Sequence, residues 1–196
     1  MFRNTYGLVL CGGQSSRMGA DKSMLTYYEK PQRYHIYDML QQLSEKVFIS
    51  GKKNQPGHIE PGYSFLADDE RYNDIGPLAA LLTAFEKFPE KNILLIGCDY
   101  PFLTAADLEN FSLLCTGEHP VSFYNEEAGI GEPLLAWYPR QLSDKLKNAF
   151  QLKQHSLKHF LKQNGALKFY PANKSSMLSI DTQAAFIQAL QSIKAS

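Results

Sequence analysis

Glycines and two cations follow an apolar run in residues 8–22, which read LVLCGGQSSRMGADK. Glycines let the backbone come close to a ligand, and successive backbone N–H groups can form a concave anion-binding site. Arg17 and Lys22 add positive charge that suits phosphate groups. A glycine pair after a strand is often only a turn, but the added Arg17, Gly19 and Lys22 favour a phosphate-binding loop. The spacing matches neither the GxxxxGKS/T nor the GxGxxG pattern.

Asp99 is the second candidate for chemistry, because it directly follows the nearly continuous apolar run at residues 92–98. Such a run is typical of a strand that is buried on both faces of a parallel sheet. Ligands of open α/β sheets bind at the carboxyl ends of the strands, so Asp99 and the glycine loop should share one edge. Mg²⁺ binds carboxylates together with phosphate oxygens. An aspartate before Pro101 also suits a turn, and the residue alone leaves both interpretations open.

The elements that position these residues alternate between strand-like and helix-like segments. This alternation predicts a three-layer, Rossmann-like α/β fold with a mainly parallel central sheet, in one domain that spans residues 1–196. Strands are expected at residues 6–11, 47–49, 63–67, 92–98, 121–124 and 133–138, and short extended runs at residues 167–170 and 177–180. Helices are expected at residues 34–43, 76–88, 104–114, 142–150, 157–163 and 183–193.

The composition narrows the class of protein. Twenty basic residues balance twenty acidic ones, which argues against a broad nucleic-acid footprint. No apolar run is long enough to span a bilayer, and the N-terminal MFRNTYG has no signal-peptide pattern. Cys11, Cys98 and Cys115 form neither a disulfide framework nor a zinc pattern, so we expect reduced thiols. These features favour a cytoplasmic protein that binds neither membranes nor nucleic acid.

The string G-G-x-S-x-R-M-G-x-D-K resembles the signature of the nucleotidyltransferases that build sugar nucleotides and modified cofactors. The resemblance is closest to the molybdenum cofactor guanylyltransferase family and extends along most of the chain, although the specific motifs lie in the first half. It implies that the loop wraps a nucleoside triphosphate. It also implies that Lys22 neutralises charge at the phosphorus under attack and that Arg17 faces the outer phosphates. The loop residues in question are Leu10, Cys11, Gly12, Gly13 and Ser15.

The second half of the nucleotide site follows from the same resemblance. Cys98-Asp99-Tyr100-Pro101 matches the family's C-D-x-P element, which favours Asp99 as a magnesium ligand. Asp68, which precedes a G-P-L-A helix start at Gly76, is implied to contact the nucleotide, and Gly76 to let that helix approach it. The alternatives are a solvated acidic loop and a turn glycine. Ser50 stands where the family often has an asparagine beside the base or ribose.

Two further residues are assigned by the resemblance with alternatives left open. Asp181 lies in the segment that matches the family's N-x-N/D-T-P element, although Gln183 replaces the proline. Asp181 is therefore either a second magnesium ligand or an ordinary helix N-cap. Glu132 lies at the start of an acceptor-side strand, where it either faces the acceptor or is merely a strand-end charge.

The implied activity is the magnesium-dependent transfer of GMP from GTP to Mo-molybdopterin, which yields molybdopterin guanine dinucleotide and pyrophosphate. Residues 1–105 would bind the nucleotide and residues 106–196 the acceptor, with transient contacts to proteins that supply or receive the cofactor. In the family, Gly12-Gly13 favours guanine, whereas relatives that use CTP tend to carry alanine-glycine. The closest alternative is a cytidylyltransferase that acts on molybdopterin or on a sugar or polyol phosphate. A non-catalytic nucleotide-binding module is a further alternative, and the missing GxGxxG disfavours a dehydrogenase.

Overall fold

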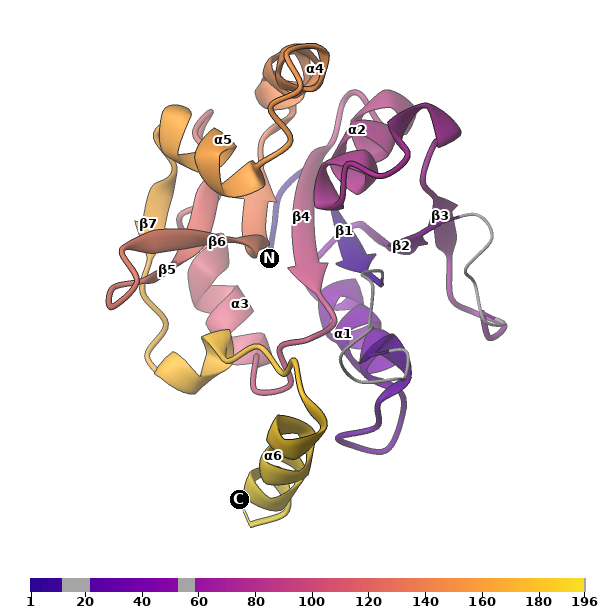
Figure 1. Cartoon of the computed structure of the whole chain (residues 1–196), viewed down its shortest axis with the longest axis vertical. Helices are drawn as coiled ribbons and strands as arrows, with labels where there is room; N and C mark the ends of the chain where they lie inside the picture. The colour runs from indigo at the N-terminus through magenta and orange to yellow at the C-terminus, as the bar shows by residue number, and fades with distance from the viewer. Residues whose placement is uncertain (12–21, 53–58, 196) are drawn as a thin grey trace.

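The computed structural model describes residues 1–11, 22–52 and 59–195, and within them it has one sheet in the order β3-β2-β1-β4-β6-β5-β7 (Figure 1). The strands are β1 (Thr5–Leu10), β2 (Lys46–Gly51), β3 (Phe65–Ala67), β4 (Asn92–Gly97), β5 (Val121–Asn125), β6 (Ile130–Tyr138) and β7 (Leu167–Phe169). The helices are α1 (Gln32–Gln41), α2 (Pro77–Lys87), α3 (Ala105–Ser112), α4 (Ser143–Gln151), α5 (Leu157–Gln163) and α6 (Gln183–Ala195). Short 3-10 helices are η1 (Lys22–Met24), η2 (Glu70–Tyr72), η3 (Arg140–Leu142) and η4 (Lys174–Met177).

The sheet is mainly parallel. Strands β3, β2, β1 and β4 run in one direction, and β5 is parallel to β7. Strand β6 is antiparallel to both of its neighbours, β4 and β5. The prediction of a mixed but mainly parallel Rossmann-like sheet is therefore confirmed. The helix connections between β1, β2 and β4 place the carboxyl ends of these strands at one edge, where such folds bind ligands.

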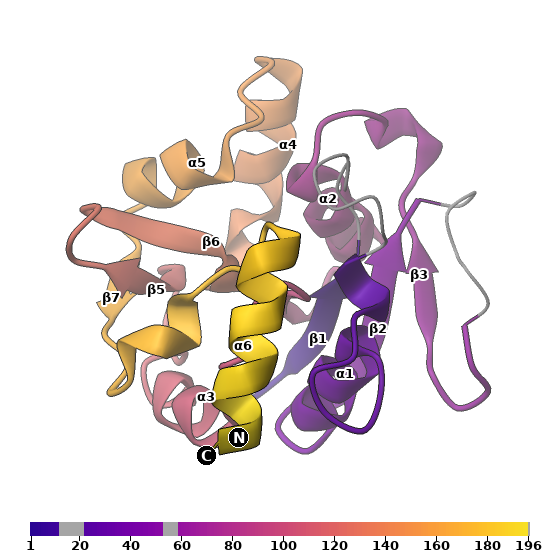
Figure 2. The same cartoon turned by 60° about the horizontal axis from the view of Figure 1, so that its bottom comes forward.

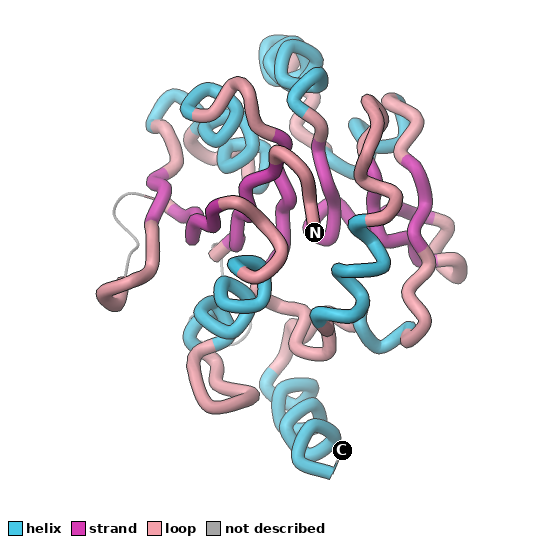
Figure 3. Tube along the Cα trace, turned by 180° about the vertical axis from the view of Figure 1, so that it is seen from behind, coloured by secondary structure: helices cyan, strands magenta, loops and turns pink. Residues whose placement is uncertain are grey.

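Helices cover both faces of the sheet, as Figures 1 and 3 show. On one face, α1 and α3 contribute Tyr34, Leu40 and Phe111 to a core cluster that includes the buried side chains of Val9 and Ile96. On the other face, α2, α4 and α5 form a second cluster over the alternate side chains of the same strands. Burial on both faces explains why β4 is apolar along nearly its whole length.

Helix α6 lies outside these three layers, on the side towards which β1 and β4 point (Figures 1 and 2). A small third cluster holds it, with buried Tyr27, Ile180 and Ala189 at its centre. The rings of Tyr27 and Phe186 meet edge to face, with centroids 5.0 Å apart. The last helix of the chain is therefore anchored to the segment that follows the glycine loop.

Two expectations about the elements need correction. Residues 177–180 were expected to form a short extended run, but Met177 belongs to η4, and the extended backbone begins only at Leu178. The N–H of Leu178 donates to the carbonyl of Ser175, which closes the turn. Strand β6 begins at Ile130 rather than at residue 133, because Asn125 and Ile130 pair across the β5–β6 turn. None of the helices in the described ranges is long and apolar enough to cross a membrane.

Candidate active site

The carboxyl ends of four neighbouring parallel strands bring the predicted residues to one edge of the sheet. The N–H of Cys11 donates to the carbonyl of Ser50 at 2.9 Å, and the N–H of Cys98 donates to the carbonyl of Leu10 at 3.3 Å. The N–H of Asp68 donates to the carbonyl of Gly51 at 3.0 Å. These backbone bonds place Leu10, Cys11, Ser50, Asp68 and Asp99 along one continuous border.

Asp99 and Asp181 share the Ser179 hydroxyl. The Oγ atom of Ser179 lies 2.7 Å from Oδ2 of Asp99 and 3.5 Å from Oδ2 of Asp181. The other carboxylate oxygen of Asp181 forms an ion pair with Nζ of Lys22. The N–H of Ile180 donates to the carbonyl of Asp99 at 2.9 Å, which fixes the two segments together. Residues from the first loop, the central strand and the last connection thus form one cluster.

The carboxylate of Asp99 is folded back over Gly97 at the end of β4. A Cβ atom at Gly97 would lie 2.7 Å from Oδ1 of Asp99 and 3.3 Å from Cβ of Leu134. Burial raises the pKa of Asp99, and the charge of Asp181 raises it further, whereas the Ser179 hydrogen bond and Lys22 lower it. A glycine is required here because any side chain would displace the carboxylate.

The structure separates the two interpretations of Asp181. The Oγ1 atom of Thr182 accepts the hydrogen bond from the N–H of Ala185 at 3.2 Å, so Thr182 is the residue that caps α6. The side chain of Asp181 is 56% exposed and points instead to Lys22, whose side chain is 22% exposed. Asp181 therefore does not cap α6, and its carboxylate lies beside Lys22 and Ser179.

The chemistry of these oxygens fits a divalent cation. Burial and the nearby charge of Asp181 both raise the pKa of Asp99, and a bound cation would favour its ionised form. Mg²⁺ characteristically uses one or two protein carboxylates and takes its remaining ligands from phosphates and water. No group of three or more metal-ligating side chains occurs among the described residues.

Ser50 and Asp68 form a second polar pair along the same edge. The hydroxyl of the fully buried Ser50 donates to Oδ1 of Asp68 at 2.8 Å. Burial raises the pKa of Asp68, while the Ser50 hydrogen bond and the charge of Lys52 lower it. The Lys52 ammonium itself donates to Oδ1 of Asp74 at 2.8 Å. Asp68 thus fixes the Ser50 hydroxyl at this edge of the sheet.

Glu132 lies on an irregular part of β6 and is hydrogen-bonded to Tyr100, the residue that follows Asp99. Strand β5 pairs Ser122 with Ala136 and then Tyr124 with Gly131, so that Phe123 alone lies opposite residues 132–135. Such bulges re-aim side chains and are common beside active sites. Burial raises the pKa of Glu132, which is hydrogen-bonded to Tyr100 and receives a backbone N–H from Leu134 at 3.3 Å.

Other predicted residues are not brought into this cluster. Gly76 begins α2 with a positive φ of 64°, and a Cβ atom there would meet no atom within 4 Å. The backbone conformation therefore accounts for this glycine. Gly12, Gly13, Ser15 and Arg17 lie outside the described residues.

Sequence reasoning missed three residues of the site: Gly97, Tyr100 and Ser179. Gly97 accommodates the Asp99 carboxylate, Tyr100 bonds Glu132, and Ser179 joins the two aspartates. In the sequence, only their nearness to Asp99 and Asp181 could have indicated these residues, because each of their contacts depends on the tertiary fold.

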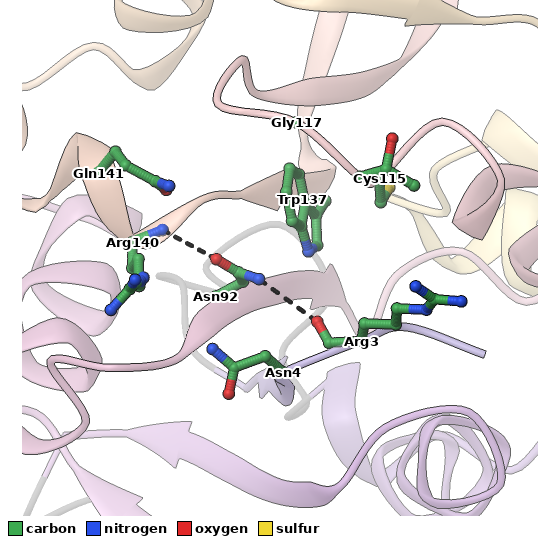
Figure 4. A pocket seen from close by; sticks show the side chains of 9 residues that line it. Arg3, Asn4, Asn92, Cys115, Gly117, Trp137, Arg140 and Gln141 are labelled. Carbon is green, nitrogen blue, oxygen red and sulfur yellow. Dashed lines mark hydrogen bonds between the residues drawn. The ribbon is translucent and has the colours of Figure 1, made fainter.

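The opposite edge of the sheet holds a cavity of about 230 Å³, which Figure 4 shows. Its amide groups are used within the fold. Asn92 donates to the carbonyl of Arg3 at 3.3 Å and accepts from the N–H of Arg140 at 3.0 Å. The guanidinium of Arg140 also pairs with Glu90. This cavity therefore lies at the amino ends of β1 and β4 and is separate from the carboxylate cluster.

A Rossmann-like sheet with Lys22, Asp99 and Asp181 at the carboxyl edge of its parallel strands is typical of a nucleotidyltransferase. The chain belongs to the MobA-like NTP transferase domain family, whose model matches residues 7–167.

Individual relatives support the same family assignment. The chain is 26% identical over 155 residues to the molybdenum cofactor guanylyltransferase of Pseudomonas entomophila, with 79% of this chain and 80% of the relative covered. It is 34% identical over 135 residues to the molybdenum cofactor biosynthesis bifunctional protein of Synechocystis. That match covers 68% of this chain but only 38% of the larger protein.

The fold is also that of solved relatives. Molybdopterin-guanine dinucleotide biosynthesis protein A from Archaeoglobus fulgidus superposes with a TM-score of 0.76 at 16% identity, covering 98% of this chain and 100% of the other. At that identity the likeness concerns the fold, and it agrees with the three layers found here.

Proposed function

We propose that this enzyme transfers GMP from GTP to Mo-molybdopterin and so forms molybdopterin guanine dinucleotide and pyrophosphate. The observation that carries this proposal is the convergence of Lys22, Asp99 and Asp181 at the carboxyl edge of the sheet. The relatives named above supply the donor and the acceptor. We further propose that residues 1–105 bind the nucleotide and residues 106–196 the acceptor.

The chemistry requires positioning and charge neutralisation rather than a strong base. A terminal phosphate oxygen of the acceptor forms a bond to the α-phosphorus of GTP. The bond from that phosphorus to the bridging oxygen breaks, and pyrophosphate leaves with the electron pair. A phosphate is already ionised, so no side chain needs to remove a proton. This explains a site built from a glycine loop, a lysine and carboxylates.

Asp99 and Asp181 would hold Mg²⁺, which supplies positive charge to the triphosphate oxygens when it is bound. Ser179 orients both carboxylates, and Gly97 leaves room for that of Asp99. Lys22, which pairs with Asp181 here, would exchange that partner for the phosphate under attack. The exchange costs little because the Asp181 side chain is exposed and well hydrated.

The remaining residues suit the two substrates. The partly buried Asp68 and the buried Ser50 form a carboxylate–hydroxyl pair beside Cys11, which can receive the hydroxyl groups of a ribose or the amino group of a base. Glu132 lies on the acceptor side, and Gly12 and Gly13 would admit guanine. We expect the reaction to take place in the cytoplasm, with transient contacts to proteins that deliver or accept the cofactor.

The donor can be tested by thermal unfolding with Mg²⁺ and each of GTP, CTP, ATP and UTP. A ligand that binds only the native state raises the apparent stability, by about 2.7 kcal/mol at a concentration of 100 times its Kd. We expect the largest shift in Tm with GTP. A larger shift with CTP would keep the chemistry and overturn the assigned donor.

A further inference from the structure

A second cavity, of about 300 Å³, lies between α5, the β5–β6 hairpin and β7, outside the residues assigned above. Three of its lining residues are lysines, and none of the described residues that line it is acidic. We call this cavity the lysine pocket; its charged members are Lys158, Lys162 and Lys168. The whole chain has no net charge, so this concentration of one sign is local.

Lys168 is held in place at the mouth of the pocket. Its Nζ lies 4.0 Å from the centroid of the Tyr124 ring, a cation–π contact. A hydrogen bond with Tyr124 raises the pKa of Lys168, so the ammonium stays charged over the physiological range. Tyr124 in turn meets Tyr170 edge to face at 5.7 Å. The charge is thus fixed by aromatic neighbours rather than by a carboxylate.

Lys158 and Lys162 stand one turn apart on α5 and face the same side of that helix. Neither forms an ion pair with a carboxylate of the described ranges. Like charges one turn apart on a helix repel each other, and a bound anion lowers that repulsion. Their arrangement therefore favours a negatively charged ligand.

The lysine pocket adjoins the active site through the irregular part of β6. Gly131 lines the pocket, and the next residue is Glu132, which bonds Tyr100 beside Asp99. The charge of Lys158 reaches the Glu132 carboxylate, since it opposes the rise in pKa that burial causes there. The bulge thus joins the two sites along one strand.

We propose that the lysine pocket binds the anionic part of the acceptor that lies away from its reacting phosphate. This rests on the proposed function, because it assumes an acceptor that reacts through one end beside Asp99 and extends past Glu132. A cavity of this volume suits a small molecule, whereas a protein or nucleic-acid partner needs a wider surface.

The first test is the kinetics of the double variant K162Q/K168Q, which leaves Lys158 and Glu132 unchanged. We expect the KM for Mo-molybdopterin to rise by on the order of 10-fold, because two charge-assisted contacts are lost, while the KM for GTP stays within about twofold. K162R/K168R should keep most of the affinity. K145Q, which removes an exposed lysine from α4, is the matched control and should behave as wild type.

A second test does not depend on group transfer. Pterin-6-carboxylate is a stable, fluorescent planar anion, and its binding can be followed by its own emission. We expect K162Q/K168Q to bind it about 10-fold more weakly than wild type or K145Q, with the difference narrowing as salt is added. If wild type transferred no GMP to Mo-molybdopterin, the proposed function would fail while this binding difference still supported the pocket. The proposal would be wrong if K162Q/K168Q kept both the wild-type KM for Mo-molybdopterin and the wild-type affinity for the probe. It would also be wrong if K145Q lost as much affinity for the probe as K162Q/K168Q.

Discussion

Lys22 and Asp181 form an ion pair across 159 positions of the sequence, immediately beside the Asp99 carboxylate. The pair ties the segment after the glycine loop to the segment before α6. Tyr27 and Phe186 make the same connection through an aromatic contact. Because these two segments lie far apart in the sequence and meet at this point, the site depends on the docking of α6 as well as on the sheet.

Replacing Asp99 by asparagine should abolish transfer and spare nucleotide binding. The amide keeps the shape and can still accept the Ser179 hydrogen bond, but it removes the negative charge that a cation needs. We expect kcat to fall by on the order of 1,000-fold, while the GTP-induced shift in Tm stays within about one third of the wild-type value. The measurement is the rate of pyrophosphate release beside thermal unfolding. Equal losses of binding and of transfer in a folded variant would argue against this role.

Asp181→Asn and Thr182→Ala should separate metal binding from helix capping. We expect Asp181→Asn to lower transfer by roughly 10- to 100-fold and to raise the Mg²⁺ concentration needed for half-maximal rate. Thr182→Ala removes the cap of α6, so it should cost about 1 kcal/mol of unfolding free energy with a near-normal rate. Magnesium titrations and urea unfolding of both variants provide the comparison. The assignment of Asp181 would be wrong if its variant lost stability but kept the wild-type magnesium dependence.

Gly97→Ala should impair the enzyme through a single methyl group. The new Cβ would meet Oδ1 of Asp99 and Cβ of Leu134, so the carboxylate must move. We expect kcat to fall by roughly 100-fold, since displacements of about 1 Å at a reacting centre have effects of this size. Gly117→Ala is the matched control, because a Cβ atom there meets nothing within 4 Å. Similar rates in the two variants would contradict the close approach at Gly97.

In the absence of ligand, Asp68→Asn should raise the free energy of unfolding, and this increase should be larger at higher pH. Burial raises the folded-state pKa of Asp68 above its usual 3.8, so ionisation of this group opposes folding once the pH exceeds that value. The advantage of the variant should therefore grow from pH 4 upward, until the folded-state pKa has been passed. Unfolding free energies of both proteins at several pH values provide the measurement.

Asp74→Asn is a control for which the change in unfolding free energy with pH should have the opposite sign. The Lys52 hydrogen bond lowers the pKa of Asp74, so its ionised form favours the folded state above the unfolded-state pKa. The Asp74→Asn protein should consequently lose stability relative to wild type as the pH rises. If the unfolding free energies of the two variants changed with pH in the same direction relative to wild type, the environments assigned to Asp68 and Asp74 would be wrong.

The sequence predicts the sheet well because its signals are local. The apolar run of β4 and the Gly76-Pro77 helix start identify their elements without any tertiary information. Asp99 was placed at the carboxyl edge correctly for the same reason, since it directly follows β4. The short extended run expected at residues 177–180 was wrong at Met177, which ends η4, because an apolar residue in a short segment suits a turn as well as an extended run.

The composition of the site depends on long-range contacts that no local pattern reveals. Asp181 and Thr182 both suit a helix cap, and only the fold shows that Thr182 takes that role. The bulge that turns Glu132 towards Tyr100 is set by the pairing of β5 with β6. The roles of Lys22, Asp99 and the other site residues stay predictions, which the variants above test.

The most direct test of the account is the product formed from α-labelled GTP, Mo-molybdopterin and Mg²⁺. We expect labelled GMP to appear in molybdopterin guanine dinucleotide with an equal amount of pyrophosphate, and neither product with the Asp99→Asn protein. CTP in place of GTP should give little product. A larger yield of dinucleotide from α-labelled CTP than from α-labelled GTP, or no labelled dinucleotide from a protein that binds GTP, would contradict the proposed reaction.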